Sequence, residues 1–280
     1  MLTSVNTIKE ILSRHNAQPS KMMGQNFLID QTILDAIIKA SHIGKEDTVL
    51  EVGPGIGTLT RELAQYAKNV IAIEKDRAMI GILKETVHDV SNIEIIQGDV
   101  LENTHYKLPT HYKLVANLPY YITSAIIRMF LETKNPPQEM ILMVQKEVGQ
   151  RICAKPPHMS ILAASVQFYG DARIISSVSK GCFWPKPNVD SAIIKITPRN
   201  NAELYAELRR KKDGVDLFFR IVKAGFLQPR KQLINNLSVA LKKEKSQIQD
   251  WLLQNNLKPS QRAETLTMQD WVNLTNTYQK

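Results

Sequence analysis

The chain of 280 residues has a formal net charge of +9 and 43% hydrophobic residues, a composition typical of a soluble protein with one large and one small domain. No apolar run approaches the ~20 residues that a membrane span needs, and the first twenty residues lack the apolar core of a secretory signal. The two cysteines, Cys153 and Cys182, fit neither a metal site nor a disulfide framework. We therefore expect a cytoplasmic protein without a metal centre.

Positive charge is concentrated near the C-terminal end. Residues 1–198 carry 21 Lys and Arg against 19 Asp and Glu, whereas residues 199–280 carry 15 against 8. A basic small domain beside a nearly neutral large one indicates a polyanionic partner. A membrane surface is the alternative, but no basic amphipathic segment rich in Trp or Phe stands out. The sequence thus favours RNA or DNA as the partner.

The first elements are a short helix around Thr7–Leu12, a non-periodic segment over 19–28, and a second helix with Asp30 as its N-cap. Apolar runs and helical patterns then alternate: strand 48–52, helix 58–67, strand 69–74, helix 76–87, strands 93–97 and 113–117, helix 122–133 and strand 139–144. This alternation predicts βαβ units, a mostly parallel sheet and an α/β fold.

Two further helices are expected at 145–154 and 159–169, followed by two strands at 172–175 and 191–196. Such a hairpin-like pair predicts an antiparallel edge of the sheet. A linker at Pro198–Asn201 would separate a first domain, 1–198, from a second, 199–280. The second domain is predicted to be all-helical, with helices at 204–212, 217–226, 231–241, 248–255 and 268–278.

A glycine-rich turn follows the first buried strand. The apolar run Val49–Val52 leads into three closely spaced glycines, Gly53, Gly55 and Gly57, and then into a helix. Glycines allow positive φ and let a ligand approach the backbone, and the first turn of a helix offers free N–H groups. A strand, a glycine turn and a helix start together predict a nucleotide-sized cradle.

Acidic residues end the next two strands. Glu74 lies about twenty residues beyond the glycines, the usual distance for a carboxylate that binds ribose hydroxyls, and Asp99 ends the third strand. Pro54 removes one N–H that a pyrophosphate would use. The pattern therefore favours a cofactor with a nucleoside but no phosphates, S-adenosylmethionine. A dehydrogenase with bound NAD is a distant alternative, since no hydride-transfer machinery is evident.

The fourth strand ends in Asn117-Leu118-Pro119-Tyr120, at the edge where open α/β sheets bind ligands. The Asn117 side-chain oxygen and the Leu118 carbonyl can each accept a hydrogen from an exocyclic adenine amine, which turns its lone pair toward a methyl donor. Tyr120 can stack on an extruded base. A second aromatic wall, Phe183, precedes the last strand in a loop stiffened by prolines.

These motifs together resemble one known family. In chain order, the motifs are Gly24–Leu28, Glu51–Gly55, Gly98-Asp99, Asn117–Tyr120, Gln145–Val148, Phe183–Ser191 and a weaker match at Arg230–Leu237. The combination resembles the ribosomal RNA adenine dimethyltransferases of the KsgA (RsmA) type.

The resemblance implies a class I, Rossmann-like methyltransferase domain with a small helical C-terminal domain that binds rRNA. It implies S-adenosylmethionine-dependent dimethylation of N6 on two adjacent adenosines in the 3′-terminal hairpin loop of 16S rRNA, late in small-subunit assembly. By the family's pattern, the cofactor site is formed by Asn26, Leu28, Gly53, Glu74, Asp99 and Asn117. Asn117 and Leu118 would also hold the target amine, and Tyr120 and Phe183 would sandwich the target base. We expect a monomer.

Two alternatives stay open at this stage. An Erm-type enzyme, which dimethylates one adenosine of 23S rRNA, shares the Asn-[Leu/Ile]-Pro-Tyr core, although Leu118 and Gln145–Val148 favour the KsgA type. A non-catalytic assembly factor that binds the small subunit is the alternative from another class, and the two roles can coexist.

Overall fold

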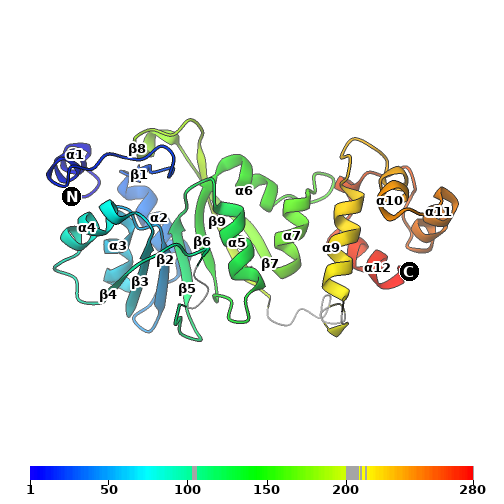
Figure 1. Ribbon diagram of the computed structural model, residues 1–280, viewed down its shortest axis with the longest axis horizontal. Coiled ribbons are helices and arrows are strands. Elements are labelled where there is room, and N and C mark those ends of the chain that lie inside the picture. Colours follow the sequence, from blue (N-terminus) through cyan, green and yellow to red (C-terminus); the bar gives the residue numbers. More distant parts are fainter. Residues whose placement is uncertain (103–105, 200–207, 209, 212, 280) are drawn as a thin grey trace. The chain divides into compact units, whose positions relative to one another are not determined.

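Apolar strands of five to nine residues form a seven-stranded sheet in the order β4-β3-β2-β5-β6-β9-β7 (Figure 1). The computed structural model describes residues 1–102, 106–199, 208, 210–211 and 213–279. The strands are β2 (Thr48–Val52), β3 (Asn69–Glu74), β4 (Ile93–Gln97), β5 (Lys113–Asn117), β6 (Met140–Gln145), β7 (Gly170–Val178) and β9 (Ser191–Pro198). The predicted strands are confirmed, and β7 is longer at both ends than predicted.

Strand direction follows the prediction as well. The pairs β4–β3, β3–β2, β2–β5 and β5–β6 are parallel, whereas β6 and β9 are antiparallel. Across the sheet, β3 and β4 follow β2 on one side, whereas β5 and β6 follow on its other side. The junction between β2 and β5 is therefore the topological switch point, where sheets of this kind bind ligands beyond the carboxyl ends of the strands.

Helices precede and follow these strands in the chain, and several of them pack on the buried, apolar central strands of the sheet. They are α1 (Val5–Arg14), α2 (Gln31–Ser41), α3 (Thr58–Tyr66), α4 (Arg77–Thr86), α5 (Thr123–Glu132) and α6 (Lys146–Ile152). Leu34 of α2 and Leu63 of α3 share one buried cluster with Val49, Val70 and Val115 of the sheet. Asp30 caps α2 as predicted, since its carboxylate accepts a hydrogen bond from the Thr32 N–H. The helices thereby fix the carboxyl edge of the strands.

A two-stranded sheet was missed by the sequence analysis. The strand β1 (Phe27–Leu28) lies in the segment expected to be non-periodic, and it pairs antiparallel with β8 (Phe183–Trp184) after the short 3₁₀ helix η1 (Lys180–Cys182). Strands of two residues are too short to show a period. The pairing brings together two segments that are far apart in sequence, and both line the site described below.

The chain divides into two compact units, residues 1–149 with 172–198 and residues 150–171 with 199–280. The second unit holds α7 (Ile161–Tyr169), α9 (Gly214–Gly225), α10 (Leu233–Leu241), α11 (Lys245–Gln254), the 3₁₀ helix η2 (Ala263–Thr265) and α12 (Met268–Thr277). It therefore includes residues 150–171, which we expected in the first domain, because the buried Phe168 of α7 packs against Phe218 of α9. The predicted helix 204–212 lies largely outside the described residues.

Within the described part of the chain, no helix combines the length and the apolar character that crossing a membrane requires.

A glycine substitution tests the turn after β2. Gly57 has φ of 85°, and a Cβ there would lie 2.8 Å from Leu83 Cδ1. We expect Gly57→Ala to lower the free energy of unfolding by about 1–3 kcal/mol in urea denaturation, because it adds both strain and overlap. Gly44→Ala is the matched control, since its Cβ would meet only Asp47 Oδ2 at 3.8 Å, and it should stay within about 0.5 kcal/mol of wild type. Equal effects of the two substitutions would contradict the strain at Gly57.

Candidate active site

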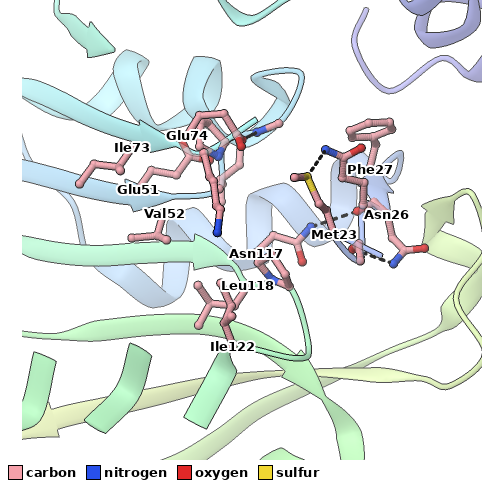
Figure 2. A pocket seen from close by; sticks show the side chains of 18 of the residues that line it. Met23, Asn26, Phe27, Glu51, Val52, Ile73, Glu74, Asn117, Leu118 and Ile122 are labelled. Carbon is pink, nitrogen blue, oxygen red and sulfur yellow. Dashed lines mark hydrogen bonds between the residues drawn. The ribbon is translucent and has the colours of Figure 1, made fainter. Parts of the chain in front are cut away.

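A pocket opens at the switch point of the first unit, beyond the carboxyl ends of β2 to β5 (Figure 2). Nine residues were predicted from the sequence to form the site, and all nine line this pocket: Asn26, Leu28, Gly53, Glu74, Asp99, Asn117, Leu118, Tyr120 and Phe183. Folding thus gathers residues from the N-terminal segment, four parallel strands and the β8 segment. Their individual roles stay predictions.

Glu74, at the end of β3, is locked to the glycine turn. Its Oε2 accepts a hydrogen bond from the Gly55 N–H at 3.0 Å, and its Oε1 accepts one from the Asp76 N–H at 2.8 Å. The side chain is 7% exposed, and burial raises its pKa although the backbone bonds oppose the shift. Each carboxylate oxygen keeps a second lone pair, so Glu74 can still accept a hydroxyl from a ligand in the pocket.

Asp99 follows β4, and both of its carboxylate oxygens already accept hydrogen bonds from the protein. Its Oδ2 accepts a hydrogen bond from Lys75 Nζ at 2.6 Å, and its Oδ1 accepts one from the Leu101 N–H at 2.9 Å. Partial burial favours the neutral form, but these bonds outweigh it and hold the pKa of Asp99 below its ordinary value. Asp99 is therefore a carboxylate at neutral pH. A ligand amine that reaches it has to share it with Lys75.

Asn117, at the end of β5, has a fixed side-chain orientation. Its Nδ2 donates to the Asn26 carbonyl oxygen at 3.2 Å, as the dashed line in Figure 2 marks. Because the amide nitrogen is committed, Oδ1 is left as a free acceptor beside the pocket. The next residue, Leu118, donates its own N–H to the Met143 carbonyl of β6 at 3.2 Å, which anchors the Asn-Leu-Pro-Tyr turn to the sheet.

The two aromatic side chains come from different segments. The Tyr120 hydroxyl is hydrogen-bonded to Ser191 Oγ at 2.8 Å, which holds the phenol ring against the first residue of β9. Phe183 is 3% exposed and lies opposite Leu28 in the β1–β8 pair. Both rings line the same pocket.

A second buried acid, Glu51 of β2, was assigned no role by the sequence analysis. Its side chain is 1% exposed, and Oε2 has no hydrogen-bond partner. Burial raises the pKa of Glu51 to about 8; the hydroxyl of Thr60 lowers it, and the nearby charge of Glu74 raises it. The buried hydroxyl of Thr58 is also unpartnered. The signal in the sequence was an acidic residue inside an otherwise apolar strand.

These features suit a cationic ligand with a nucleoside. Unpartnered buried polar atoms are rare unless a ligand or water satisfies them, and Glu51 Oε2 and the Thr58 hydroxyl are two such atoms on residues that line the pocket. Glu74 and Asp99 place two further acceptors along the same edge. By contrast, no group of three or more His, Cys, Asp or Glu side chains in the described ranges could hold a metal ion.

The sheet order, its switch point and the glycine turn with acids after the next two strands define a class I S-adenosylmethionine-dependent methyltransferase. The sequence model of the family described as "Ribosomal RNA adenine dimethylase" matches residues 2–280. The chain belongs to this family.

Relatives of known name align in sequence with nearly the whole chain. "Ribosomal RNA small subunit methyltransferase A" of Clostridioides difficile is 41% identical over 273 residues, which cover 94% of this chain and 92% of the relative. The protein of the same name from Geobacillus thermodenitrificans is 39% identical over 280 residues, covering 96% and 94%.

Solved structures give the same fold. A dimethyladenosine transferase from Plasmodium falciparum matches with a TM-score of 0.74 and 27% identity, covering 89% of this chain and 95% of that one. The 23S rRNA methyltransferase ErmE matches with a TM-score of 0.72 and 25% identity, covering 90% and 98%. The predicted fold class and family are confirmed.

The raised pKa of Glu51 predicts how stability depends on pH. From about pH 5 to 8 the folded chain keeps the Glu51 proton, whereas the unfolded chain, with its ordinary value of 4.5, has lost it. The folded state then binds more protons, so this group makes the free energy of unfolding fall as pH rises, by at most about 1.4 kcal/mol per pH unit. Glu51→Gln should remove this part of the slope in urea denaturation between pH 5.5 and 8.

The exposed Glu94 of β4 provides the control, because Glu94→Gln leaves the buried carboxyl in place. Its slope should match that of the wild type. If the slope of Glu51→Gln also matched, Glu51 would not be protonated in the folded state.

Proposed function

We propose that this protein uses S-adenosylmethionine to dimethylate N6 of two adjacent adenosines in the 3′-terminal hairpin loop of 16S rRNA, late in the assembly of the small ribosomal subunit. The observation that carries the proposal is the anchored Asn117, whose amide nitrogen is bonded to the Asn26 carbonyl so that Oδ1 remains a free acceptor at the pocket. The 41% identity to a small subunit methyltransferase supports the choice of RNA.

The chemical problem is the poor nucleophilicity of the adenine amine, whose lone pair is delocalised into the ring. Asn117 Oδ1 and the Leu118 carbonyl would each accept one N6 hydrogen, which holds the amine and turns its lone pair out of the ring plane. Pro119 has no N–H to compete for these acceptors. Positioning and fixed dipoles therefore supply the rate enhancement, without a general base of shifted pKa.

Aromatic walls would hold the extruded base. Tyr120, fixed through its bond to Ser191, and the buried Phe183 line the pocket beside Asn117. Enzymes that act on a base commonly take it out of the stack and place it between such side chains. Rings on both faces of the adenine would also exclude water from the reacting amine.

The other residues of the pocket would hold the cofactor. When bound, S-adenosylmethionine supplies an electrophilic methyl group. Gly53 would lie under its methionine end, Glu74 would accept the ribose hydroxyls, and Asp99 would accept the adenine amine of the cofactor. Asn26 and Leu28 would complete the walls of this site, and Asn117 would touch both cofactor and target. The buried Glu51, whose Oε2 has no hydrogen-bond partner, is a further polar group that the bound cofactor would satisfy.

The positive charge of the C-terminal residues and the identity to small subunit enzymes both support rRNA as the binding partner. Residues 199–280 carry 15 Lys and Arg against 8 Asp and Glu, a balance that suits binding to rRNA phosphates. We propose that a cytoplasmic monomer acts on the assembling small subunit. An Erm-type activity on 23S rRNA is less well supported, because ErmE is 25% identical, against 41% for the small subunit enzyme of C. difficile.

Methyl transfer to ribosomal subunits tests the substrate. Small subunits that lack the modification should accept label from S-adenosylmethionine, and primer extension should stop at the paired adenosines of the 3′ hairpin. Label found only in large-subunit RNA would instead assign an Erm-type activity. Absence of label from both, with cofactor bound, would leave a non-catalytic assembly factor.

Asn117→Ala separates catalysis from binding. Loss of the Oδ1 acceptor should lower the rate of methyl transfer at saturating cofactor by at least about 100-fold, while co-sedimentation with small subunits persists. Asn69→Ala, at an exposed position that begins β3, is the matched control and should keep wild-type activity. Loss of both activity and subunit binding in Asn117→Ala would argue that this asparagine is structural.

A further inference from the structure

A second, wider groove adjoins the pocket within the first unit. It encloses about 1050 Å³ between the end of α1, the segment that follows it and the loop after β8. It shares four residues with the pocket: Gly24, Gln25, Asn26 and Tyr120. Whatever enters the pocket past Tyr120 can therefore extend directly into this groove.

The charge of the groove is entirely positive. Among the described residues that line it, the charged ones are Lys9, Lys21 and Lys186, and none is Asp or Glu. All three lysines are exposed, and no carboxylate of the described residues forms an ion pair with them. A concave surface lined by charges of one sign attracts ligands of the opposite sign, so three ammonium groups around this groove favour an anionic occupant.

An aromatic ring forms part of the wall. Trp184 is partly exposed and lies opposite Phe27 in the β1–β8 pair, with the two ring centroids 6.5 Å apart and their planes at 25°. Lys9 Nζ lies 5.8 Å from the centroid of the indole. A cation over an exposed ring is held only weakly. A base could therefore take its place against Trp184, while the ammonium moves to a phosphate.

We propose that this groove holds the single-stranded RNA next to the target adenosine, with phosphates on Lys9, Lys21 and Lys186 and a neighbouring base against Trp184. The inference rests on the proposed function, since a base extruded into the pocket leaves its backbone at the pocket mouth. A basic groove with an aromatic platform is the usual way to bind a single strand.

The lysines are tested together by the salt dependence of binding. In the triple variant Lys9→Gln, Lys21→Gln, Lys186→Gln, KM for unmodified small subunits should rise, and the slope of log KM against log salt should fall by about 2, because each single-strand phosphate contact contributes about 0.7. The matched control removes the same charge at exposed positions of the first unit outside the groove: Lys39→Gln, Lys84→Gln and Lys134→Gln. Its slope should equal that of the wild type.

Two substitutions, one that removes the aromatic ring and one that keeps a ring, test the role of Trp184. Trp184→Leu should raise KM at least about fivefold, because stacking on one base is lost, while Trp184→Phe keeps a ring and should stay within about twofold. Cofactor affinity, measured by calorimetry, should be unchanged in all these variants. This readout separates a loss of RNA contact from a disturbed pocket.

The outcomes distinguish the two proposals. A wild-type protein that transfers no methyl group to small subunits overturns the proposed function itself. An active wild type whose salt slope falls equally in the groove variant and the control, or in neither, overturns the groove alone. Equal effects of Leu and Phe at position 184 would overturn the stacking role of Trp184.

Discussion

The site depends on the parallel pairing of β2 with β3 on one side and with β5 on the other. Because both neighbours run in the same direction as β2, the turns that leave all three strands emerge at one edge. The glycine turn after β2, Glu74 after β3 and Asn117 at the end of β5 therefore face one pocket. The buried helices on the sheet fix this edge, and they keep the three turns at the spacing that a nucleoside requires.

A long-range hydrogen bond then closes the site. Asn117 Nδ2 and the Asn26 carbonyl belong to residues 91 positions apart in sequence, and β1 continues from Asn26 into its pairing with β8. One side chain thus joins the edge of the large sheet to the small one. The same bond orients the remaining oxygen of Asn117, so the contact that organises the N-terminal segment also prepares the acceptor on which the proposed chemistry depends.

Sequence patterns predicted the large sheet, its direction and most of the pocket residues, because buried strands, glycine turns and terminal acids each have a local signal. Asn26 and Leu28 have no such signal and were predicted only from the family resemblance. Sequence patterns could not predict the pairing of Phe27–Leu28 with Phe183–Trp184, since two-residue strands have no period and the paired residues are 157 and 155 positions apart in sequence. They also missed α7 as part of the second unit. That assignment depends on the packing of Phe168 against Phe218, which no local pattern reports.

The distribution of charge explains how one edge of the protein can serve two ligands of opposite sign. The pocket is lined by Glu74, Asp99, one lysine and a Glu51 that stays protonated at neutral pH, whereas the charged side chains that line the adjoining groove are all lysines. The carboxylates of the pocket make it less favourable for phosphates than the groove is. If the proposed function is correct, only the neutral adenine base enters the pocket past Tyr120. The phosphates of the RNA backbone remain outside, next to the lysines of the groove. Electrostatics would thus select which part of the RNA enters, before any hydrogen bond to the amine forms.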